Sequence, residues 1–502
     1  MYAVILAAGI GSRLRPLTYE APKCMTEVYG VSILERQVQA FERIGIQDII
    51  IITGYRSTDI ESLNLPIRYN QVNFTFIENS DYESTNNMYS LYLGRSKVDG
   101  SPFYLCNGDV FFDPQIVQEM NQDPALSLVA VDSQNYFEES MKVTVNQSGV
   151  ITDISKGIKK ESAFACSIDL YKFSAESSSI LFKELRHLIE TEQRLKDWTE
   201  VALQGLFRTS RLTMYPYQIG DRNWVEIDDF NDLLLADLKF ARLRPEQLRD
   251  KTLLIDLDGT LFIGDQLIPQ ADSFIRKLEA IGIPYFLFSN NSSYSKASLV
   301  DKLAHIGIEV TEERIILSTD GVIHFLNNKR ISKIHVVGTA RMRDEFTKQG
   351  FCLTSEAPDF VVLGYDTELN YDKIKTASYY LNKGIPLLAT HCDVNCPTAT
   401  GPIPDIGSML AMFEAALQVT PYKIFGKPNA EMVSPLFDQL HLTPDKMVVI
   451  GDRLYTDMKL ARNVGAHFIC VLSGETNRAD LQDKKDYPDL IIQSVEKLLE
   501  YL

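Results

Sequence analysis

Two aspartates near the middle of the chain have the spacing of a catalytic pair. Asp256 and Asp258 end the apolar run Leu253–Ile255 and come directly before a Gly-Thr turn. Side chains two positions apart in an extended segment point the same way, so both carboxylates can reach one pocket at a strand end. Neighbouring carboxylates repel each other unless a cation or a shared proton intervenes. The pair therefore predicts a Mg²⁺ site in which one carboxylate can act as a nucleophile and form an aspartyl-phosphate.

Later segments of the second half carry residues that suit the same chemistry, each after an apolar run. Ser289 and Asn290 offer a hydroxyl and an amide to phosphate oxygens. Lys427 offers a cation, and Asp452 and Asp457 offer further carboxylates. Because ligands of open parallel sheets bind at the carboxyl ends of strands, we expect these residues to form one phosphate-binding centre. Two solvated aspartates at a strand end are the alternative interpretation of the central pair.

A glycine-rich loop follows the first apolar run of the chain. Gly9 and Gly11 allow the backbone to approach a ligand closely, and successive N–H groups in such a loop can bind an anion. Arg13, Arg15 and Lys23 follow soon after, a density of cations that suits a triphosphate. The loop is neither a Walker A motif nor a complete dinucleotide fingerprint. Solvated surface charges are the alternative interpretation of these cations.

The elements that must position these residues alternate between strand-like and helix-like segments, which is typical of an α/β fold. The 502 residues are enough for about three structural units. About 135 residues separate Asn291 from Lys427, too many for a loop, and their alternating pattern predicts an inserted α/β cap. The predicted units are residues 1–240, a linker at 241–251, and residues 252–502 with the cap at about 325–418.

The composition excludes several classes of function. A net charge of −17 argues against nucleic acid as a partner. The chain has no apolar run of eighteen residues, so we expect no membrane insertion, and its first residues lack the basic segment of a signal peptide. Seven scattered cysteines favour a reduced, cytoplasmic protein. A homo-oligomer is compatible with the sequence, which does not decide the oligomeric state.

The opening motif Leu6–Thr18, followed by Pro22 and Lys23, resembles that of nucleotidyltransferases that make nucleoside diphosphate-activated metabolites. The resemblance implies a Rossmann-like sheet and transfer of a nucleoside monophosphate from an NTP to a phosphorylated acceptor, with release of pyrophosphate. It also implies catalytic roles for Arg13 and Lys23. The nucleotide-binding residues that it implies are Leu6, Ala8, Gly9, Gly11, Asn79 and Asn107.

The segment Asn86–Ser90 resembles the choline-phosphate and aminoethylphosphonate cytidylyltransferase branch, which implies CTP as donor. By the same resemblance, Asp109 matches the Mg²⁺ aspartate of the family, with Glu226 and Asp228 as its partners. Lys142 and Lys156 are candidates to meet the acceptor phosphate. An aromatic and acidic group is a candidate to cage a trimethylammonium or pair with an amine, although such aromatics also occur in cores. It comprises Trp198, Glu200, Tyr215, Tyr217 and Trp224.

The second half resembles the haloacid dehalogenase (HAD) phosphatases in the order of its four motifs, and its cap resembles the nitrophenylphosphatase-like (IIA) subfamily. This implies that Asp256 is the nucleophile and Asp258 the general acid and base. Ser289, Asn290 and Lys427 would bind the phosphoryl group. Asp256, Asp258 through its backbone carbonyl, and Asp452 would hold Mg²⁺, while Asp457 would orient the site. The subfamily tends to have Asn-x-Asp where this chain has His391-Cys392-Asp393, and Asp405 is an additional acid.

These observations predict a bifunctional enzyme that combines CTP-dependent cytidylyl transfer to a small, phosphocholine-like acceptor with Mg²⁺-dependent hydrolysis of a phosphomonoester. Its partners would be CTP, or another NTP, and small phosphorylated metabolites. One alternative is a sugar 1-phosphate nucleotidyltransferase that uses another NTP, with the second half acting on a sugar phosphate. Another makes the second half a sensor without catalytic activity.

Overall fold

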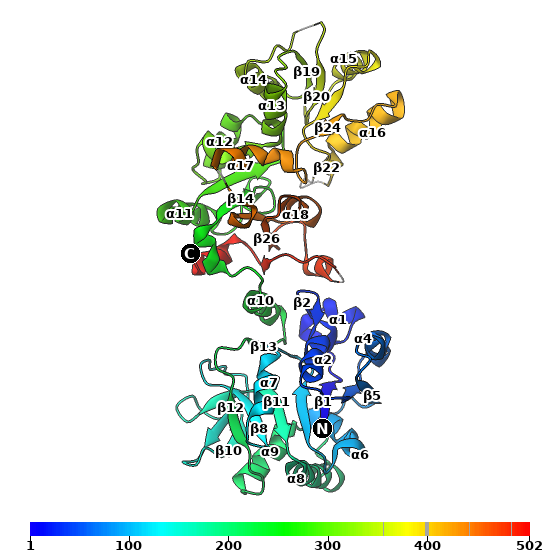
Figure 1. Cartoon of the computed structure of the whole chain (residues 1–502), viewed down its shortest axis with the longest axis vertical. Coiled ribbons are helices and arrows are strands. Elements are labelled where there is room, and N and C mark those ends of the chain that lie inside the picture. Colours follow the sequence, from blue (N-terminus) through cyan, green and yellow to red (C-terminus); the bar gives the residue numbers. More distant parts are fainter. Residues whose placement is uncertain (355, 397–400, 441, 483) are drawn as a thin grey trace. The chain divides into compact units, whose positions relative to one another are not determined.

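The computed structural model describes residues 1–354, 356–396, 401–440, 442–482 and 484–502. Contacts divide the chain into two compact units, Met1–Phe240 and Ala241–Leu502. The first unit packs helices around a mixed sheet and the second around parallel sheets, so the α/β class predicted from the sequence is confirmed (Figure 1). Within the described ranges, no helix has the length and apolar character that crossing a bilayer requires.

The first unit, which is described throughout, is built on one nine-stranded sheet. β1 (Tyr2–Ala7) pairs in parallel with β4 (Asp48–Thr53) and β6 (Phe103–Asn107), and β4 pairs in parallel with β5 (Asn73–Glu78). β11 (Ala165–Phe173) runs antiparallel to β6, which places the middle of β11 beside the carboxyl end of β6. The other strands of this sheet are β8 (Leu128–Asp132), β9 (Lys142–Val145), β10 (Ile151–Ser155) and β12 (Tyr215–Gln218).

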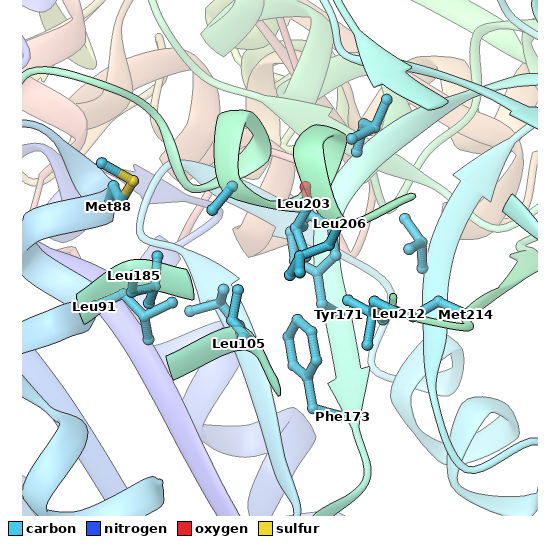
Figure 2. Packing of buried hydrophobic residues seen from close by; sticks show 14 of the residues in the cluster. Met88, Leu91, Leu105, Tyr171, Phe173, Leu185, Leu203, Leu206, Leu212 and Met214 are labelled. Atoms are coloured by element: carbon cyan, nitrogen blue, oxygen red, sulfur yellow. The ribbon is translucent and has the colours of Figure 1, made fainter. Parts of the chain in front are cut away.

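Helices cover both faces of this sheet. Val4 and Leu6 of β1 face one cluster, and Ala3 and Ile5 face the other, because strand side chains alternate between faces. Figure 2 shows the first cluster, in which Leu185 and Leu203 belong to two of the covering helices. The helices of the first cluster are α5 (Asn87–Leu93), α8 (Ala175–Arg186) and α9 (Thr199–Arg208); those of the second are α2 (Ile33–Arg43) and α7 (Gln115–Gln122).

Shorter elements complete the first unit. The strands β7 (Val110–Phe112) and β13 (Trp224–Glu226) form an antiparallel pair, and α10 (Phe230–Lys239) packs against β13. The remaining elements are α1 (Leu17–Glu20), β2 (Glu27–Val28), β3 (Val31–Ser32), α3 (Ser57–Ser62), α4 (Leu65–Arg68) and α6 (Arg95–Val98).

The second unit has a core sheet of parallel strands. β14 (Thr252–Asp256) lies between β17 (Tyr285–Ser289) and β25 (Met447–Gly451), so the predicted catalytic segments leave the sheet at adjacent carboxyl ends. The described strands β18 (Ile315–Leu317), β26 (His467–Val471) and β27 (Leu490–Ile492) extend this sheet. Its other elements are β15 (Phe262–Ile263), β16 (Gln266–Leu267), α11 (Ala271–Ile281), α12 (Lys296–His305), α17 (Ser434–Leu440) and α18 (Lys459–Val464).

The inserted cap has a parallel sheet of its own, and it extends further on both sides than the predicted bounds of 325–418. Val322 of α13 (Ser318–Asn328) is buried in the core of the cap, and β24 (Lys423–Ile424) is a strand of its sheet. The other elements of the cap are β19 (Ile334–Val337), α14 (Ala340–Lys348), β20 (Phe360–Leu363), α15 (Tyr371–Asn382), β21 (Leu387–Ala389), β22 (Asn395–Cys396), β23 (Ile403–Pro404) and α16 (Ile406–Leu417).

Residues 241–251, predicted to form a linker, are packed into the second unit instead. The backbone amides of Arg242 and Leu243 both donate to the carbonyl of Asp489 at 3.0 Å. Leu243 and Leu248 are buried. Most residues of this segment are charged or polar, so its composition did not predict that Leu243 and Leu248 would be buried and hold the segment in the second unit.

Candidate active sites

Three acidic side chains of the first unit meet near the carboxyl ends of its central strands. Asp109 follows β6, Glu226 ends β13, and Asp228 lies two residues further on. The pairing of β13 with β7 sets Glu226 opposite Val110, beside Asp109. Carboxylate oxygens of the three residues lie within 4.8 Å of one another. The residues predicted as metal ligands in this half are therefore brought together.

Two cations neutralise this acidic group. Lys23 Nζ donates to Asp109 Oδ2 at 2.9 Å and to Asp228 Oδ1 at 2.5 Å. Arg13 Nη2 pairs with Asp228 Oδ2 at 2.7 Å. Burial works to lower the pKa of Lys23, but the two aspartates outweigh burial and raise this pKa above its ordinary value. Burial, followed by the charge of Asp109, raises the pKa of Glu226 to about 8.

Gly11 shapes the loop that brings Lys23 to the acids. Its φ of +67° lies in the left-handed region that glycine adopts without steric cost. A Cβ at this position would lie 2.8 Å from the Cβ of Lys23. Gly11 was predicted to contact the nucleotide, yet it does not line the cavity of this fully described unit. Its contribution is to let the loop close against Lys23.

A cavity of about 340 Å³ opens beside these charges. Asn79 lies in its wall and is held there by hydrogen bonds of 3.0 Å from its Nδ2 to Thr85 Oγ1 and Ser90 Oγ. These hydrogen bonds fix Asn79 in position, so the fold itself holds this polar part of the cavity wall in place beside α5. The other predicted residues that line it are Leu6, Ala8, Gly9, Arg13, Asn107, Asp109, Lys156, Trp198, Glu200, Glu226 and Asp228.

The wall of this cavity also contains an acid that sequence reasoning missed. Asp169 has a φ of +56° within β11, where the register between β11 and β8 shifts. Its Oδ2 accepts from Asn107 Nδ2 at 3.0 Å. The hydroxyl of Tyr171 lies 3.1 Å from Asp169 Oδ1 and 2.8 Å from Glu200 Oε1. Burial raises the pKa of both acids. An aspartate between Ile168 and Leu170 in a strand is the one signal that could have found it.

Lys142, predicted to meet the acceptor phosphate, is a buried structural residue. Its Nζ donates to the carbonyls of Glu138 and Lys156 at 2.5 and 2.7 Å, which leaves it no access to a ligand. The prediction is wrong because a loop over β9 encloses the ammonium. Lys156, the other predicted lysine, lines the cavity and places its Nζ 5.0 Å from the ring centroid of Trp198.

The predicted aromatic cage is not formed around this cavity. Trp198 and Glu200 line it, but the other three predicted members do not. Trp224 is buried, donates from Nε1 to Asp132 Oδ2 at 2.8 Å, and borders a neighbouring cavity of about 490 Å³. The two remaining residues, Tyr215 and Tyr217, lie on β12.

The second unit places Lys427 between two carboxylates at the carboxyl end of its core sheet. Lys427 Nζ donates to Asp256 Oδ1 at 2.5 Å and to Asp457 Oδ1 at 2.7 Å, and all three side chains are buried. Burial works to lower the pKa of Lys427, but the two carboxylates outweigh it and raise that pKa. A buried charge requires such partners, so this group is fixed in the folded chain.

Asp452 joins Asp256 and Asp457 in a cluster whose carboxylate oxygens lie within 4.8 Å of one another. Burial, followed by the charges of Asp256 and Asp457, raises the pKa of Asp452 to about 8. A Cβ on Gly259, whose φ is +82°, would lie 2.3 Å from Asp452 Oδ2, so only glycine fits there. Asp457 was predicted to orient the site, and its carboxylate is itself one of the three in this cluster. Asp258 was predicted to hold the metal through its backbone carbonyl; its carboxylate is not one of the three in this cluster.

Ser289 ends β17 and Asn290 follows it, but their side chains make different contacts. Ser289 lines the cavity at this centre, and its Oγ accepts from the amide of Asn291 at 3.1 Å. Asn290 Oδ1 accepts from the amide of Lys427 at 2.7 Å, while its Nδ2 donates to Asp393 Oδ2 at 3.0 Å. The Asn290 side chain, predicted to bind phosphate, instead ties the backbone of Lys427 to the cap.

The cavity at this centre measures about 90 Å³ and lies between the core and the cap. Asp256, Asp258, Ser289 and Lys427 line it from the core. Burial, followed by the charge of Asp256, raises the pKa of Asp258, which favours its protonated form. The residues that line the cavity without having been predicted as site residues are Asn291, Tyr365, His391, Asp393, Asn395, Cys396, Asp405 and Arg453.

Both acid clusters have the composition of a magnesium site, since Mg²⁺ prefers carboxylate oxygens. Asp109 Oδ1 and Asp452 Oδ1 are buried and have no hydrogen-bond partner among the described residues. A buried oxygen without a partner is costly, and a divalent cation would satisfy it. The residues present therefore fit Mg²⁺ at both centres.

Comparison with known proteins relates the first unit to nucleotidyltransferases. Residues 3–166 match the model of the MobA-like NTP transferase domain. This region contains the glycine-rich loop, Lys23 and Asp109, and it ends within β11. The match shows a nucleotidyltransferase domain and leaves the donor and the acceptor open.

The second unit matches two models, the haloacid dehalogenase-like hydrolase over residues 253–352 and the HAD-hydrolase-like model over 424–498. It is similar to 5'-nucleotidase YutF of Bacillus subtilis, with 29% identity over 50% of this chain and 98% of that protein. A solved 4-nitrophenylphosphatase of Thermotoga maritima is 35% identical, with a TM-score of 0.49, over 50% of this chain and 98% of that one. Dihydroxyacetone phosphatase of Corynebacterium glutamicum is 31% identical over 49% of this chain and 90% of its own length. Through its second unit, the chain belongs to the haloacid dehalogenase-like hydrolase family.

Proposed function

We propose that the first unit transfers a cytidylyl group from CTP to a small acceptor that carries a phosphate or phosphonate and a primary ammonium, and that the second unit hydrolyses small phosphomonoesters through Asp256. The observation that carries the proposal is the same in both halves. Each gathers three carboxylates with a buried lysine at the mouth of a cavity.

The acid-rich wall of the first cavity supports an ammonium acceptor. Asp169 and Glu200 lie on either side of the Tyr171 hydroxyl and can accept N–H donors. A primary ammonium has three such donors, whereas a trimethylammonium has none and needs aromatic faces around it. The described aromatic residues in this wall are Tyr82 and Trp198, and the ammonium of Lys156 already lies over the Trp198 ring.

The donor is proposed from the segment Asn86–Ser90, of which Asn86, Asn87 and Ser90 line the same cavity. In the transfer, an oxygen of the acceptor phosphate would attack the α-phosphorus of CTP, and pyrophosphate would leave. Lys23 and Arg13 would offset the negative charge of the phosphates, while Mg²⁺ held by Asp109, Glu226 and Asp228 would stabilise the same charge when bound. Positioning and electrostatics account for catalysis of this kind.

In the second unit, Asp256 would attack phosphorus and Asp258 would donate its proton to the departing oxygen as the phosphorus–oxygen bond breaks. Water would then attack the aspartyl-phosphate, with Asp258 as the base that takes its proton, and orthophosphate would leave. Lys427 and Ser289 would hold phosphoryl oxygens. Asp256, Asp452 and Asp457 would hold a Mg²⁺ ion, which supplies electrostatic stabilisation when bound.

The test of the transferase uses the full chain carrying Asp256→Asn, so that the phosphatase cannot destroy the acceptors. Pyrophosphate release is measured with CTP, UTP, GTP or ATP against phosphoethanolamine, aminoethylphosphonate, phosphocholine, glycerol 3-phosphate and glucose 1-phosphate. We expect the highest rate for CTP with a primary amine. A preference for glucose 1-phosphate would replace the proposal with sugar nucleotide synthesis. Hydrolysis of p-nitrophenyl phosphate by the chain with Asp109→Asn tests the phosphatase separately.

A further inference from the structure

Two buried, ionisable side chains meet in the cap. His391 follows β21 and Asp405 precedes α16, and both line the cavity opposite Asp256. His391 Nε2 lies 3.1 Å from Asp405 Oδ1, and the side chains are 1% and 8% exposed. Asp393 completes a group whose ligand atoms lie within 4.8 Å of one another. Residues His391, Asp393 and Asp405 are called the cap acid wall below.

Hydrogen bonds fix this wall relative to the phosphoryl site. Asp405 Oδ1 accepts from the amide of Ile406 at 2.6 Å at the start of α16. Asp393 Oδ2 accepts from Asn290 Nδ2 at 3.0 Å, and Asn290 also holds the amide of Lys427. Asp393 and Asp405 therefore line the cap side of the cavity whose core side holds the Asp256–Lys427 ion pair.

The acidic side chains around the pocket outnumber the basic ones. A Mg²⁺ ion and a phosphate dianion offset each other, which leaves the charges of the chain itself. The carboxylates at this centre outnumber the cations that line the cavity, Lys427 and Arg453, even when Lys302 near Asp258 is added. The core contributes Asp256, Asp258, Asp452, Asp457, Lys427 and Arg453, and the wall adds Asp393 and Asp405.

We infer that the cap acid wall selects phosphomonoesters whose leaving group carries a positively charged amine. The inference rests on the proposed phosphatase function of the second unit. Two carboxylates within reach of one group favour a cation and repel an anion, and a charge misplaced in a desolvated pocket is penalised strongly. The cavity of about 90 Å³ is smaller than that of the first unit, which suits a small leaving group such as ethanolamine.

The experiment compares kcat/KM of the full chain for four esters by phosphate release. These are phosphoethanolamine with a cationic leaving group, glycerol 3-phosphate with a neutral one, 3-phosphoglycerate with an anionic one, and p-nitrophenyl phosphate as a general probe. We expect wild type to prefer phosphoethanolamine to glycerol 3-phosphate about tenfold or more, a factor that corresponds to one favourable charge contact, and 3-phosphoglycerate to be the poorest.

Asp405→Asn and Asp393→Asn should reduce the ratio of phosphoethanolamine to glycerol 3-phosphate about tenfold each. Asparagine keeps the shape and can still cap α16, so a change in this ratio is not explained by loss of the fold. Asp344→Asn, at an exposed position of α14, is the matched control and should leave the ratio unchanged. A wild-type preference for glycerol 3-phosphate, which needs no variant to detect, would overturn the inference, as would variants with an unchanged ratio. Absence of activity on p-nitrophenyl phosphate would instead refute the proposed phosphatase function.

Discussion

Replacing Asp452 with asparagine should make the second unit more stable in the absence of metal while abolishing its activity. Asp452 is 2% exposed, and its Oδ1 has no hydrogen-bond partner among the described residues. Its pKa is raised from 3.8 to about 8 by burial and by Asp256 and Asp457. Each unit of pKa corresponds to about 1.4 kcal/mol, so ionised Asp452 costs the fold roughly 5 kcal/mol at pH 8.

Asparagine removes this charge but weakens the hydrogen bond that Asp452 Oδ2 accepts from the amide of Glu475 at 2.6 Å. A charged hydrogen bond exceeds a neutral one by about 1–2 kcal/mol, which leaves a net gain of about 3 kcal/mol. For a unit of about 260 residues, this gain corresponds to a rise in Tm of about 5 °C.

The sign of the pH dependence follows from the direction of the shift. A carboxyl group whose pKa is raised in the folded state binds its proton more tightly there, so its stability contribution is lost as pH rises from about 4 toward 8. The advantage of Asp452→Asn should therefore be largest at pH 8 and fall by more than half at pH 5. Mg²⁺ should stabilise wild type at pH 8 and have a smaller effect on the variant.

Thermal unfolding in EDTA, followed by far-UV circular dichroism, measures this effect. Both tryptophans, Trp198 and Trp224, belong to the first unit, so their fluorescence reports that unit alone and should not change. Asp301→Asn removes the same charge from an exposed position of α12 and should leave both transitions in place. If Asp452→Asn melts below wild type at pH 8, or if Asp301→Asn gives the same gain, the argument that burial and neighbouring acids make ionised Asp452 unfavourable is refuted.

Three further predictions concern single residues. Lys427→Met should destabilise the second unit by about 3 kcal/mol in EDTA, because it leaves Asp256 and Asp457 buried without their cation. Thermal unfolding followed by circular dichroism measures this loss, and an unchanged Tm would contradict the prediction. Gly11→Ala should reduce the rate of pyrophosphate release at least tenfold without affecting phosphatase activity, because the alanine Cβ would lie 2.8 Å from the Cβ of Lys23. Equal rates of pyrophosphate release in the variant and wild type would show that the loop can shift freely. Phosphatase rates on alkyl phosphates should fall as the pH rises past the raised pKa of Asp258 and this residue loses its proton; burial and Asp256 raise that pKa. The rate on p-nitrophenyl phosphate, which has a good leaving group, should fall less, and identical pH profiles would exclude Asp258 as the acid.

The residues that could be predicted from the sequence are those that end parallel strands. Asp256 and Asp452 each follow an apolar run, and the parallel pairing of β14 with β25 brings the two ends together. The same reasoning applies to Asp109 after β6. For these residues, the local pattern and the geometry of a parallel sheet determine position, so few long-range contacts had to be known.

The residues that could not be predicted depend on contacts between distant segments. Asp169 reaches the transferase cavity because β11 changes register on β8 and turns this residue to a positive φ. Lys142 is withdrawn by two backbone carbonyls of neighbouring loops. His391 and Asp405 are fourteen residues apart in sequence and pair only because β21 and α16 are folded together. No local composition encodes such pairings.

The two cavities share a polarity that neither sheet imposes. At one end of each, acids suited to Mg²⁺ lie beside a buried lysine, where an anionic phosphate can bind. Further acids line each cavity: Asp169 and Glu200 in the first unit, Asp393 and Asp405 in the second. A zwitterion that carries a phosphate and an ammonium would match both arrangements, whereas a neutral polyol would bring no cation to these acids. The two units would then compete for substrates of one class, and the concentration of the nucleotide donor would decide whether an aminoalcohol phosphate is activated or hydrolysed.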